Sequence, residues 1–275
     1  MSKVTERERE ERLAEKLTKG EKVISVDEMS QEYKEHLVHL MTMQADSELA
    51  GAYGYVPWIM KSPSIQETLT VSQIVKDEVR HGRVMYRLLE GLGFPVQDYY
   101  ESHNFNLRVN EEDIGTQRAA DDKRVNIFYY PIDTWYDFIM FNFCMDRGAG
   151  HQLEDAKDCS YKPWCDVMEG IFKEEAMHMA HGDFWVKKLA GDKATHDEAQ
   201  EALNRWYPRT MNIFGRQNSP KNKIYRKLGL KKRDNEEVRQ TFALEVKQRC
   251  QEFGLAVPDW KPVESKMLEE PFIPG

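Results

Sequence analysis

Two short stretches of similar sequence decide the fold of this chain. Residues 77–81 are Asp-Glu-Val-Arg-His, and residues 174–178 are Glu-Glu-Ala-Met-His. In each stretch an acid precedes Glu-x-x-His, within a segment of helical periodicity. Residues three apart lie on one face of an α-helix, so the glutamate and the histidine of each stretch can bind one cation together. One such tetrapeptide arises often by chance, but two of them are typical of a four-helix bundle that binds two metal ions.

Each stretch has a partner carboxylate at a matched distance. Glu48 precedes Glu78 by 30 residues, and Asp146 precedes Glu175 by 29. A segment containing proline lies at or next to each midpoint, which predicts a turn between two antiparallel helices. Residues equidistant from such a turn lie at the same height, here roughly 20 Å from it at ~1.5 Å per residue. The six predicted metal ligands, which are also the predicted catalytic residues, are Glu48, Glu78, His81, Asp146, Glu175 and His178.

Two other acids of the predicted third helix do not meet this height criterion. Glu154 would lie only about 10 Å from its turn. Asp137 would lie well beyond the required height, and it completes the capping box Thr134-x-x-Asp137. Ion pairs with Arg80 and Arg147 on solvated faces are the alternative interpretation of the six side chains. That alternative leaves the equal heights to coincidence, so we expect the metal site.

Four carboxylates balance the charge of two divalent cations, and with two imidazoles they suit iron or manganese. By analogy with other di-iron sites, Glu78 and Glu175 are expected to bridge the metals, and Glu48 and Asp146 to be terminal ligands. Unpaired, so many buried carboxylates would be strongly unfavourable, so we expect the metals to stabilise the core.

The acid that precedes each Glu-x-x-His also has an expected role. Metal-bound histidines usually donate their second ring N–H to a carboxylate or carbonyl. We predict that this contact crosses the bundle, from His178 to Asp77 and from His81 to Glu174.

The composition excludes several classes of protein. The 275 residues carry a formal charge of −8, which argues against a general nucleic-acid binder. Apolar runs are too short to span a bilayer, and the first residues lack the apolar core of a secretory signal. The four cysteines show no C-x-x-C spacing and no disulfide framework, so a reducing cytoplasm is the expected compartment; they are Cys144, Cys159, Cys165 and Cys250.

Helix signals predict an all-α, ferritin-like four-helix bundle with a long crossover and additional C-terminal helices. A connection of about 40 residues between two helical hairpins is the feature that favours a ferritin-like order. The predicted helices run from Ser30 to about Tyr53, with an end or kink in 51–58, from Ser64 to Gly91, from Thr134 to about Asp158, from Pro163 to Ala190, onward from Thr195, and from Asn235 to about Phe253. We predict a charged helical arm in 1–24, the di-iron domain in 25–260 and an extended tail in 261–275.

Several segments resemble the phenylacetic acid catabolic protein family. They include Asp-Ser-Glu-Leu-Ala-Gly at 46–51, Lys-Asp-Glu-Val-Arg-His-Gly at 76–82, Met-Asp-Arg-Gly-Ala at 145–149 and Lys-Glu-Glu-Ala-Met-His at 173–178. The resemblance implies a reductively activated di-iron oxygenase that adds one atom of O₂ across an aromatic ring bond of an acyl-CoA thioester such as phenylacetyl-CoA. It also implies a non-catalytic, ferritin-like partner protein, with a homo-oligomer as the alternative. We expect no nucleic-acid or membrane partner.

A strand followed by G-x-G-x-x-G is absent from the sequence, so we expect electrons from NAD(P)H to arrive through a separate reductase. Residues 216–233 hold eight basic residues and no acid. We predict that some of them bind the coenzyme A phosphates, above all Lys231, Lys232 and Arg233. A basic surface that faces solvent or an acidic partner is the alternative interpretation. For the whole chain, the alternatives are an acyl desaturase, an iron- or peroxide-handling bundle, and a non-catalytic scaffold component.

Overall fold

A computed structural model describes residues 5–110, 113 and 122–260. Over these residues it contains α-helices, short 3₁₀ turns and one isolated β-bridge, without β-strands. The α-helices are α1 (Glu6–Thr18), α2 (Gln31–Lys61), α3 (Ile65–Gly91), α4 (Val96–Ser102), α5 (Trp135–Leu153), α6 (Lys162–Gly191), α7 (His196–Met211), α8 (Pro220–Lys227) and α9 (Asn235–Phe253). The all-α prediction is confirmed.

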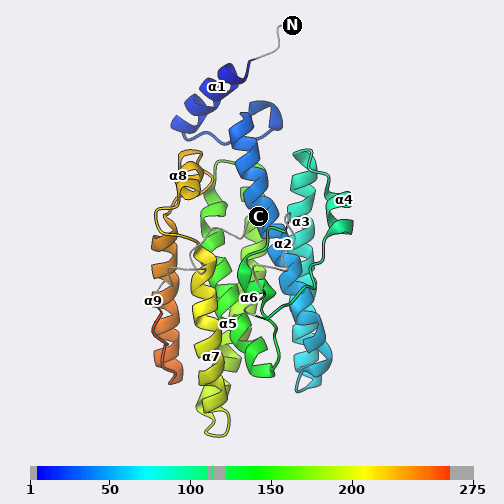
Figure 1. Cartoon of the computed structure of the whole chain (residues 1–275), viewed down its shortest axis with the longest axis vertical. Helices are drawn as coiled ribbons and strands as arrows, with labels where there is room; N and C mark the ends of the chain where they lie inside the picture. The colour runs from blue at the N-terminus through cyan, green and yellow to red at the C-terminus, as the bar shows by residue number, and fades with distance from the viewer. Residues whose placement is uncertain (1–4, 111–112, 114–121, 261–275) are drawn as a thin grey trace.

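Two antiparallel helical hairpins form the bundle. Figure 1 shows α2 beside α3 and α5 beside α6, with their axes roughly parallel. Contacts of α3 with α6 and of α2 with α5 join the two hairpins, and the long crossover that contains α4 connects them. Helices α7 and α9 pack against the α5–α6 side, as the ferritin-like prediction with additional C-terminal helices requires.

Side-chain caps fix the starts of three bundle helices. Ser30 accepts a hydrogen bond from the backbone N–H of Tyr33, and Ser64 accepts one from that of Glu67. Thr134 and Asp137 form the predicted reciprocal capping box at the start of α5. Because each cap satisfies backbone N–H groups that lack a partner within the helix, the starts of these helices can be predicted from sequence.

Helix α2 is longer than predicted. It continues through Gly51, Gly54 and Pro57 to Lys61. Pro57 lies near its C-terminal end, where the missing N–H removes a single intrahelical bond. Burial of Tyr55 and Trp58 offsets that loss. The prediction was that the helix ends or kinks within 51–58, and the part of it that ends the helix there is wrong.

Three other features differ from the sequence prediction: the end of one helix, a cap and an additional short helix. The third bundle helix is α-helical only to Leu153 and continues as a 3₁₀ turn over Glu154–Asp158. Thr195 does not cap α7 with its side chain; its hydroxyl donates to the carbonyl of Leu189 at 2.7 Å. The short helix α8 was not predicted, although its start is marked in the sequence: the Ser219 side chain accepts a hydrogen bond from the backbone N–H of Asn222, and Pro220 is the first helical residue.

The N-terminal helix α1 projects from one end of the bundle (Figure 1). The chain after it is held by the β-bridge between Val23 and Tyr161. The predicted tail, residues 261–275, lies outside the described residues. In the part of the chain that is described, no helix has the length and apolar character needed to cross a lipid bilayer.

Candidate metal centre

The structure brings all six predicted ligands together in the middle of the bundle. Helix α2 supplies Glu48, α3 supplies Glu78 and His81, α5 supplies Asp146, and α6 supplies Glu175 and His178. All six residues are buried, and the two histidine rings are fully so.

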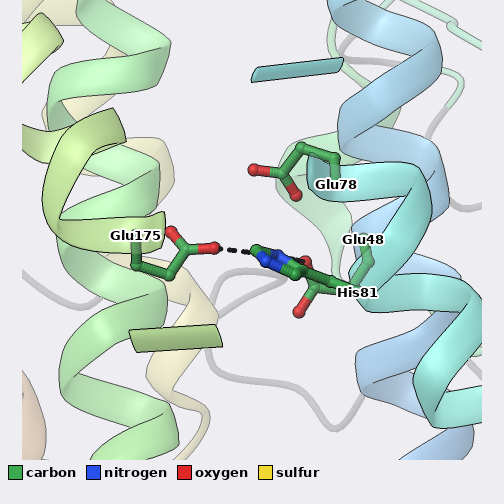
Figure 2. A group of neighbouring side chains, drawn as sticks. All are labelled: Glu48, Glu78, His81 and Glu175. Carbon is green, nitrogen blue, oxygen red and sulfur yellow. Dashed lines mark ion pairs between the residues drawn. The ribbon is translucent and has the colours of Figure 1, made fainter. Parts of the chain in front are cut away.

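The six side chains form two overlapping groups. Glu48, Glu78, His81 and Glu175 make one group, in which the candidate ligand atoms lie within 4.8 Å of one another; Figure 2 shows Glu175 facing the other three across the bundle. The second group, within the same limit, contains Glu78, Asp146, Glu175 and His178. Glu78 and Glu175 belong to both groups, which is the arrangement expected of carboxylates that bridge two cations.

Both histidines turn the same ring nitrogen toward the carboxylates. The Nδ1 atom of His81 lies 3.2 Å from Oε1 of Glu175 and 3.5 Å from Oε2 of Glu48. The Nδ1 atom of His178 lies 3.1 Å from Oε1 of Glu78 and 3.6 Å from Oε2 of Glu175. The shorter contact of each ring is thus to the glutamate of the other Glu-x-x-His stretch, whereas the longer contacts differ, since His81 faces Glu48 and His178 faces Glu175.

Burial and crowding perturb the acids of the centre. Burial, together with the charge of Glu175, raises the pKa of Glu78 well above its ordinary value. The same two causes raise the pKa of Asp146 to about 7. Burial also disfavours the charged form of Glu175, but the nearby rings of His178 and His81 outweigh it and lower the pKa of Glu175 to about 2. A cluster with such opposed shifts is typical of a functional site.

The donor set fits two divalent cations. The Nδ1 atoms of His81 and His178 are buried, without a geometrically adequate hydrogen bond, and face oxygens of the shared glutamates. Four buried carboxylates with two imidazoles supply the hard and intermediate ligands that iron or manganese prefers. The proposal that these six residues are metal ligands therefore stands on side-chain geometry as well as on sequence.

Only one of the two predicted contacts across the bundle has hydrogen-bond length. The Nε2 atom of His81 lies 2.7 Å from Oε2 of Glu174, as predicted. The Nε2 atom of His178 lies 3.7 Å from Asp77, too far for a hydrogen bond. Asp77 instead accepts two contacts from the amide of Gln73, at 2.7 and 2.8 Å.

A chain of buried polar groups that was not predicted from the sequence lies behind Asp146. The amide of Asn142 donates to Asp146, and its oxygen lies 2.8 Å from Nδ1 of His181. The other ring nitrogen of His181 contacts the carboxylate of Glu67, and the hydroxyl of Tyr55 lies 3.2 Å from Asp146. Asn142 precedes Asp146 by one helical turn, and that spacing is the sequence signal that could have identified it.

A cavity opens directly onto the candidate ligands. It encloses about 910 Å³, including space open to solvent, and its inner wall contains four of the six ligands. Its remaining lining is mostly apolar, and Phe128 and Phe141 lie near the acids. Phe128 comes from the crossover, and its ring lies 3.4 Å from the position that a side-chain carbon on Gly51 would occupy. The crossover therefore forms part of the wall of the cavity.

The basic segment meets this cavity at one residue. Lys231 lines it and also lines a second cavity of about 830 Å³, whose other basic residues include Arg209, Arg216 and Lys221. Lys232 instead pairs with Asp158, and Arg233 pairs with Asp155 at 2.7 Å. Of the three residues predicted to bind coenzyme A, the structure brings only Lys231 to the cavity wall.

The fold and the site define a ferritin-like helical protein with a buried cluster of carboxylates and histidines. The family model described as Phenylacetic acid catabolic protein matches residues 14–269, and the chain belongs to this family. One component of the 1,2-phenylacetyl-CoA epoxidase of Escherichia coli K12 is 28% identical over 256 residues, covering 91% of this chain and 77% of the relative. Benzoyl-CoA oxygenase component B from Aromatoleum evansii is 24% identical over 233 residues, covering 76% of this chain and 47% of the relative. Both relatives are named for oxygen chemistry on an aromatic acyl-CoA.

Proposed function

We propose that this chain is the di-iron component of an oxygenase that uses O₂ and externally supplied electrons to epoxidise the aromatic ring of an acyl-CoA thioester resembling phenylacetyl-CoA. The observation that carries the proposal is the apolar cavity that joins the carboxylate and histidine cluster to Lys231. Candidate metal ligands, apolar side chains that suit an aromatic ring and a lysine that suits a charged coenzyme all line this one cavity.

The six clustered side chains would hold two iron ions. When bound, iron supplies the electron transfer and the open coordination positions that the reaction of O₂ requires. Glu78 and Glu175, which belong to both groups of side chains, would hold both ions, while His81 and His178 would contribute Nδ1, the nitrogen that faces these glutamates.

The rest of the cavity would orient the substrate and exclude water. Phe128 and Phe141 line the same cavity as the acids, so their rings could pack against an aromatic acyl group. Apolar walls also keep bulk water away from the reacting atoms. The chain itself would thus contribute to the reaction by positioning the aromatic ring and by excluding water from the site.

Lys231 would mark the route of the thioester. The acyl group enters the main cavity, and the coenzyme extends past Lys231 into the second cavity, where Arg216 and Lys221 can bind phosphates. This arrangement retains the expectation that cations of the basic segment bind coenzyme A. Lys232 and Arg233 would not contact the coenzyme in this arrangement. They pair with Asp158 and Asp155 and would instead stabilise the loop beside Lys231.

Electrons would come from NAD(P)H through a separate reductase. Glu174, whose side chain is 32% exposed, connects the buried ring of His81 to the surface, and it also pairs with Arg80. This is a short route between the centre and the surface of the α3–α6 face. A non-catalytic, ferritin-like partner protein or a second copy of the chain completes the proposed assembly.

The alternatives differ in what fills the cavity. An iron- or peroxide-handling bundle needs no reductase and no thioester, and an acyl desaturase acts on a flexible aliphatic chain. Aromatic side chains beside the acids favour a planar ring, and the cations in the second cavity favour a phosphorylated carrier. We therefore prefer the oxygenase.

One set of assays separates these functions. The purified chain is loaded with ferrous iron, its metal content is determined, and O₂ consumption is followed with a chemical reductant and phenylacetyl-CoA, benzoyl-CoA or palmitoyl-CoA. We expect about two iron ions per chain and an aromatic product that gains one labelled atom from ¹⁸O₂. Glu175→Ala should abolish both, whereas Glu169→Ala, an exposed change on the same helix, should preserve both. Oxidation of palmitoyl-CoA alone, or iron loss without any change in product, would reject the proposal.

A further inference from the structure

Two of the four cysteines lie side by side outside the metal centre. The Sγ atoms of Cys159 and Cys165 are 3.7 Å apart, and both thiols are free. Cys159 is fully buried in the turn that precedes α6, whereas Cys165 is partly exposed in the first turns of that helix. No sequence motif marks this pair, because five residues lie between the two cysteines and the turn that they form folds back.

The surroundings of Cys165 favour its thiolate. The ammonium group of Lys22 lies 3.8 Å from its sulfur, and the N-terminal end of α6 contributes further positive potential. A hydrogen bond from Cys159 lowers the pKa of Cys165 to about 6, with Lys22 adding to the effect against burial. The same contact, together with burial, raises the pKa of Cys159. The partly exposed thiol therefore favours its thiolate form, and its buried neighbour favours the protonated form.

We propose that Cys165 is a peroxide-reactive thiolate and that Cys159 is its resolving partner, so that the two form a reversible disulfide. The Cys165 thiolate attacks hydrogen peroxide, its sulfur is oxidised to a sulfenic acid, and the O–O bond breaks with release of hydroxide. The Cys159 thiol then forms an S–S bond to that sulfur, and the oxygen leaves as water after taking up the thiol proton. One peroxide is reduced and two thiols are oxidised. A cellular thiol reductant restores the pair.

The position of the pair gives the oxidation a structural target. Ser160, next to Cys159, makes two backbone hydrogen bonds. Its carbonyl accepts one from the N–H of Val23 at 2.7 Å, and its N–H donates one to the carbonyl of Gly229 at 2.8 Å. Lys22 lies between Cys165 and the Cys159 carbonyl, which is 2.6 Å from its Nζ. The turn thus joins the N-terminal segment to the loop that carries Lys231. Forming the disulfide removes the thiolate charge that faces Lys22 at this junction.

The proposed disulfide is independent of the oxygenase function, and peptide mapping of the full-length chain tests it. After exposure to micromolar hydrogen peroxide, we expect a disulfide between Cys159 and Cys165, while Cys144 and Cys250, which are buried elsewhere, stay reduced and serve as internal controls. Cys159→Ser should stop the reaction at a sulfenic acid on Cys165 that dimedone traps. Cys165→Ser should abolish both products. Reversal by dithiothreitol completes the expected result.

A second measurement covers the case in which a cysteine variant fails to fold. In the unmodified chain, the rate of iodoacetamide alkylation of Cys165 should rise with a midpoint near pH 6, and Lys22→Gln should move that midpoint upward. A midpoint near 9, the ordinary pKa of a cysteine thiol, would overturn the proposal. So would a rate of Cys165 oxidation by peroxide that is no faster than the rate of Cys144 oxidation.

Discussion

Glu174 of α6 accepts a hydrogen bond from Nε2 of His81 of α3 at 2.7 Å. This contact leaves Nδ1 of His81 as the ring nitrogen that can bind a metal ion. Carboxylates in this position orient a ligating imidazole and raise its basicity, and their loss typically costs about 10- to 100-fold in metal affinity. Glu174→Ala should therefore weaken iron binding by roughly that factor. Competition with a chromogenic chelator measures it. Glu169→Ala removes a carboxylate that pairs with exposed Lys173 and should leave the affinity unchanged; equal affinities for both variants would contradict the assigned role of Glu174.

Bound metal ions should offset the repulsion among the buried carboxylates and so stabilise the folded chain. Glu78 is 6% exposed and lies close to Glu175, so its charge is unfavourable in the metal-free chain. We expect Glu78→Gln to raise the melting temperature of the metal-free chain and to abolish metal-induced stabilisation. For the unmodified chain, free ferrous iron at 100 times its dissociation constant should add about 2.7 kcal/mol to the unfolding free energy for each independent site. Thermal melts with and without iron test both parts, and a metal-induced shift that persists in Glu78→Gln would argue against this residue as a ligand.

The sequence is informative where one periodic rule governs position. Equal distances from the two turns are enough to predict that Glu48 and Asp146 lie level with the duplicated motifs, because helical rise is nearly constant. Caps such as Ser64 and Thr134 are also predictable, since they depend on a few adjacent residues.

Contacts set by tertiary packing cannot be predicted in this way. The distance between the Cys159 and Cys165 sulfurs depends on an irregular turn, and Phe128 reaches the cavity only through the path of the crossover. The spacing of Glu67 from Ser64 predicts a capping box, but its carboxylate contacts His181 instead, which gives a buried ring a partner. Local propensity does not report such competition for a side chain.

His103 should make the attachment of the crossover sensitive to pH. Its Nε2 atom lies 3.5 Å from Asp46 of α2 and 3.6 Å from Asp122, which also pairs with Arg124. Phe105 stacks on its ring at 3.8 Å. Burial disfavours the imidazolium, but the two nearby carboxylates outweigh it and raise the pKa of His103 to about 9.

A raised pKa means that protonated His103 stabilises the folded state fully below the ordinary value of 6.5, and that this stabilisation is lost as pH rises to about 9. The upper limit is on the order of 3 kcal/mol. His103→Gln should therefore lower the unfolding free energy more at pH 6 than at pH 9.5, as denaturant titrations can show. His36→Gln, at a ring that packs edge-on against Tyr225, is the comparison variant, and an equal pH trend in the two variants would contradict the role assigned to His103.

Gly182 sets the spacing between α5 and α6 near the centre. A side-chain carbon at this position would lie 2.9 Å from the Cα atom of Phe143, and backbone cannot move aside as a flexible side chain can. Gly182→Ala should therefore destabilise the chain by about 1–3 kcal/mol and reduce iron binding by displacing His178, one turn away. Gly170→Ala, on the same helix with open space around it, should instead stabilise by up to about 1 kcal/mol. Two equal stability changes in chemical denaturation would show that close helix contact is not the cause.

Lys231 should govern thioester affinity without affecting the metal centre. Among the described residues that line the cavity at the candidate metal centre, it is the one basic residue, and it also lines the second cavity. Its amino group lies 3.3 Å from the amide oxygen of Gln152. Burial lowers its pKa, so an anionic ligand beside it would restore favourable surroundings for its charge. Lys231→Met preserves the length and apolar character of the side chain while removing that charge. We expect about a tenfold rise in the KM for phenylacetyl-CoA, the equivalent of ~1.4 kcal/mol, with kcat and iron content little changed.

Lys232→Met is the matched control, because the Lys232 side chain is half exposed and pairs with Asp158 rather than lining the cavity. It should leave KM within about twofold of the unmodified chain, since an exposed ion pair contributes under ~1 kcal/mol. Isothermal titration with coenzyme A alone separates phosphate binding from ring binding: a weaker affinity in Lys231→Met but not in Lys232→Met places the coenzyme beside Lys231. If both variants bind coenzyme A equally well, the thioester enters the cavity by another route, and the cations of the basic segment serve the surface instead.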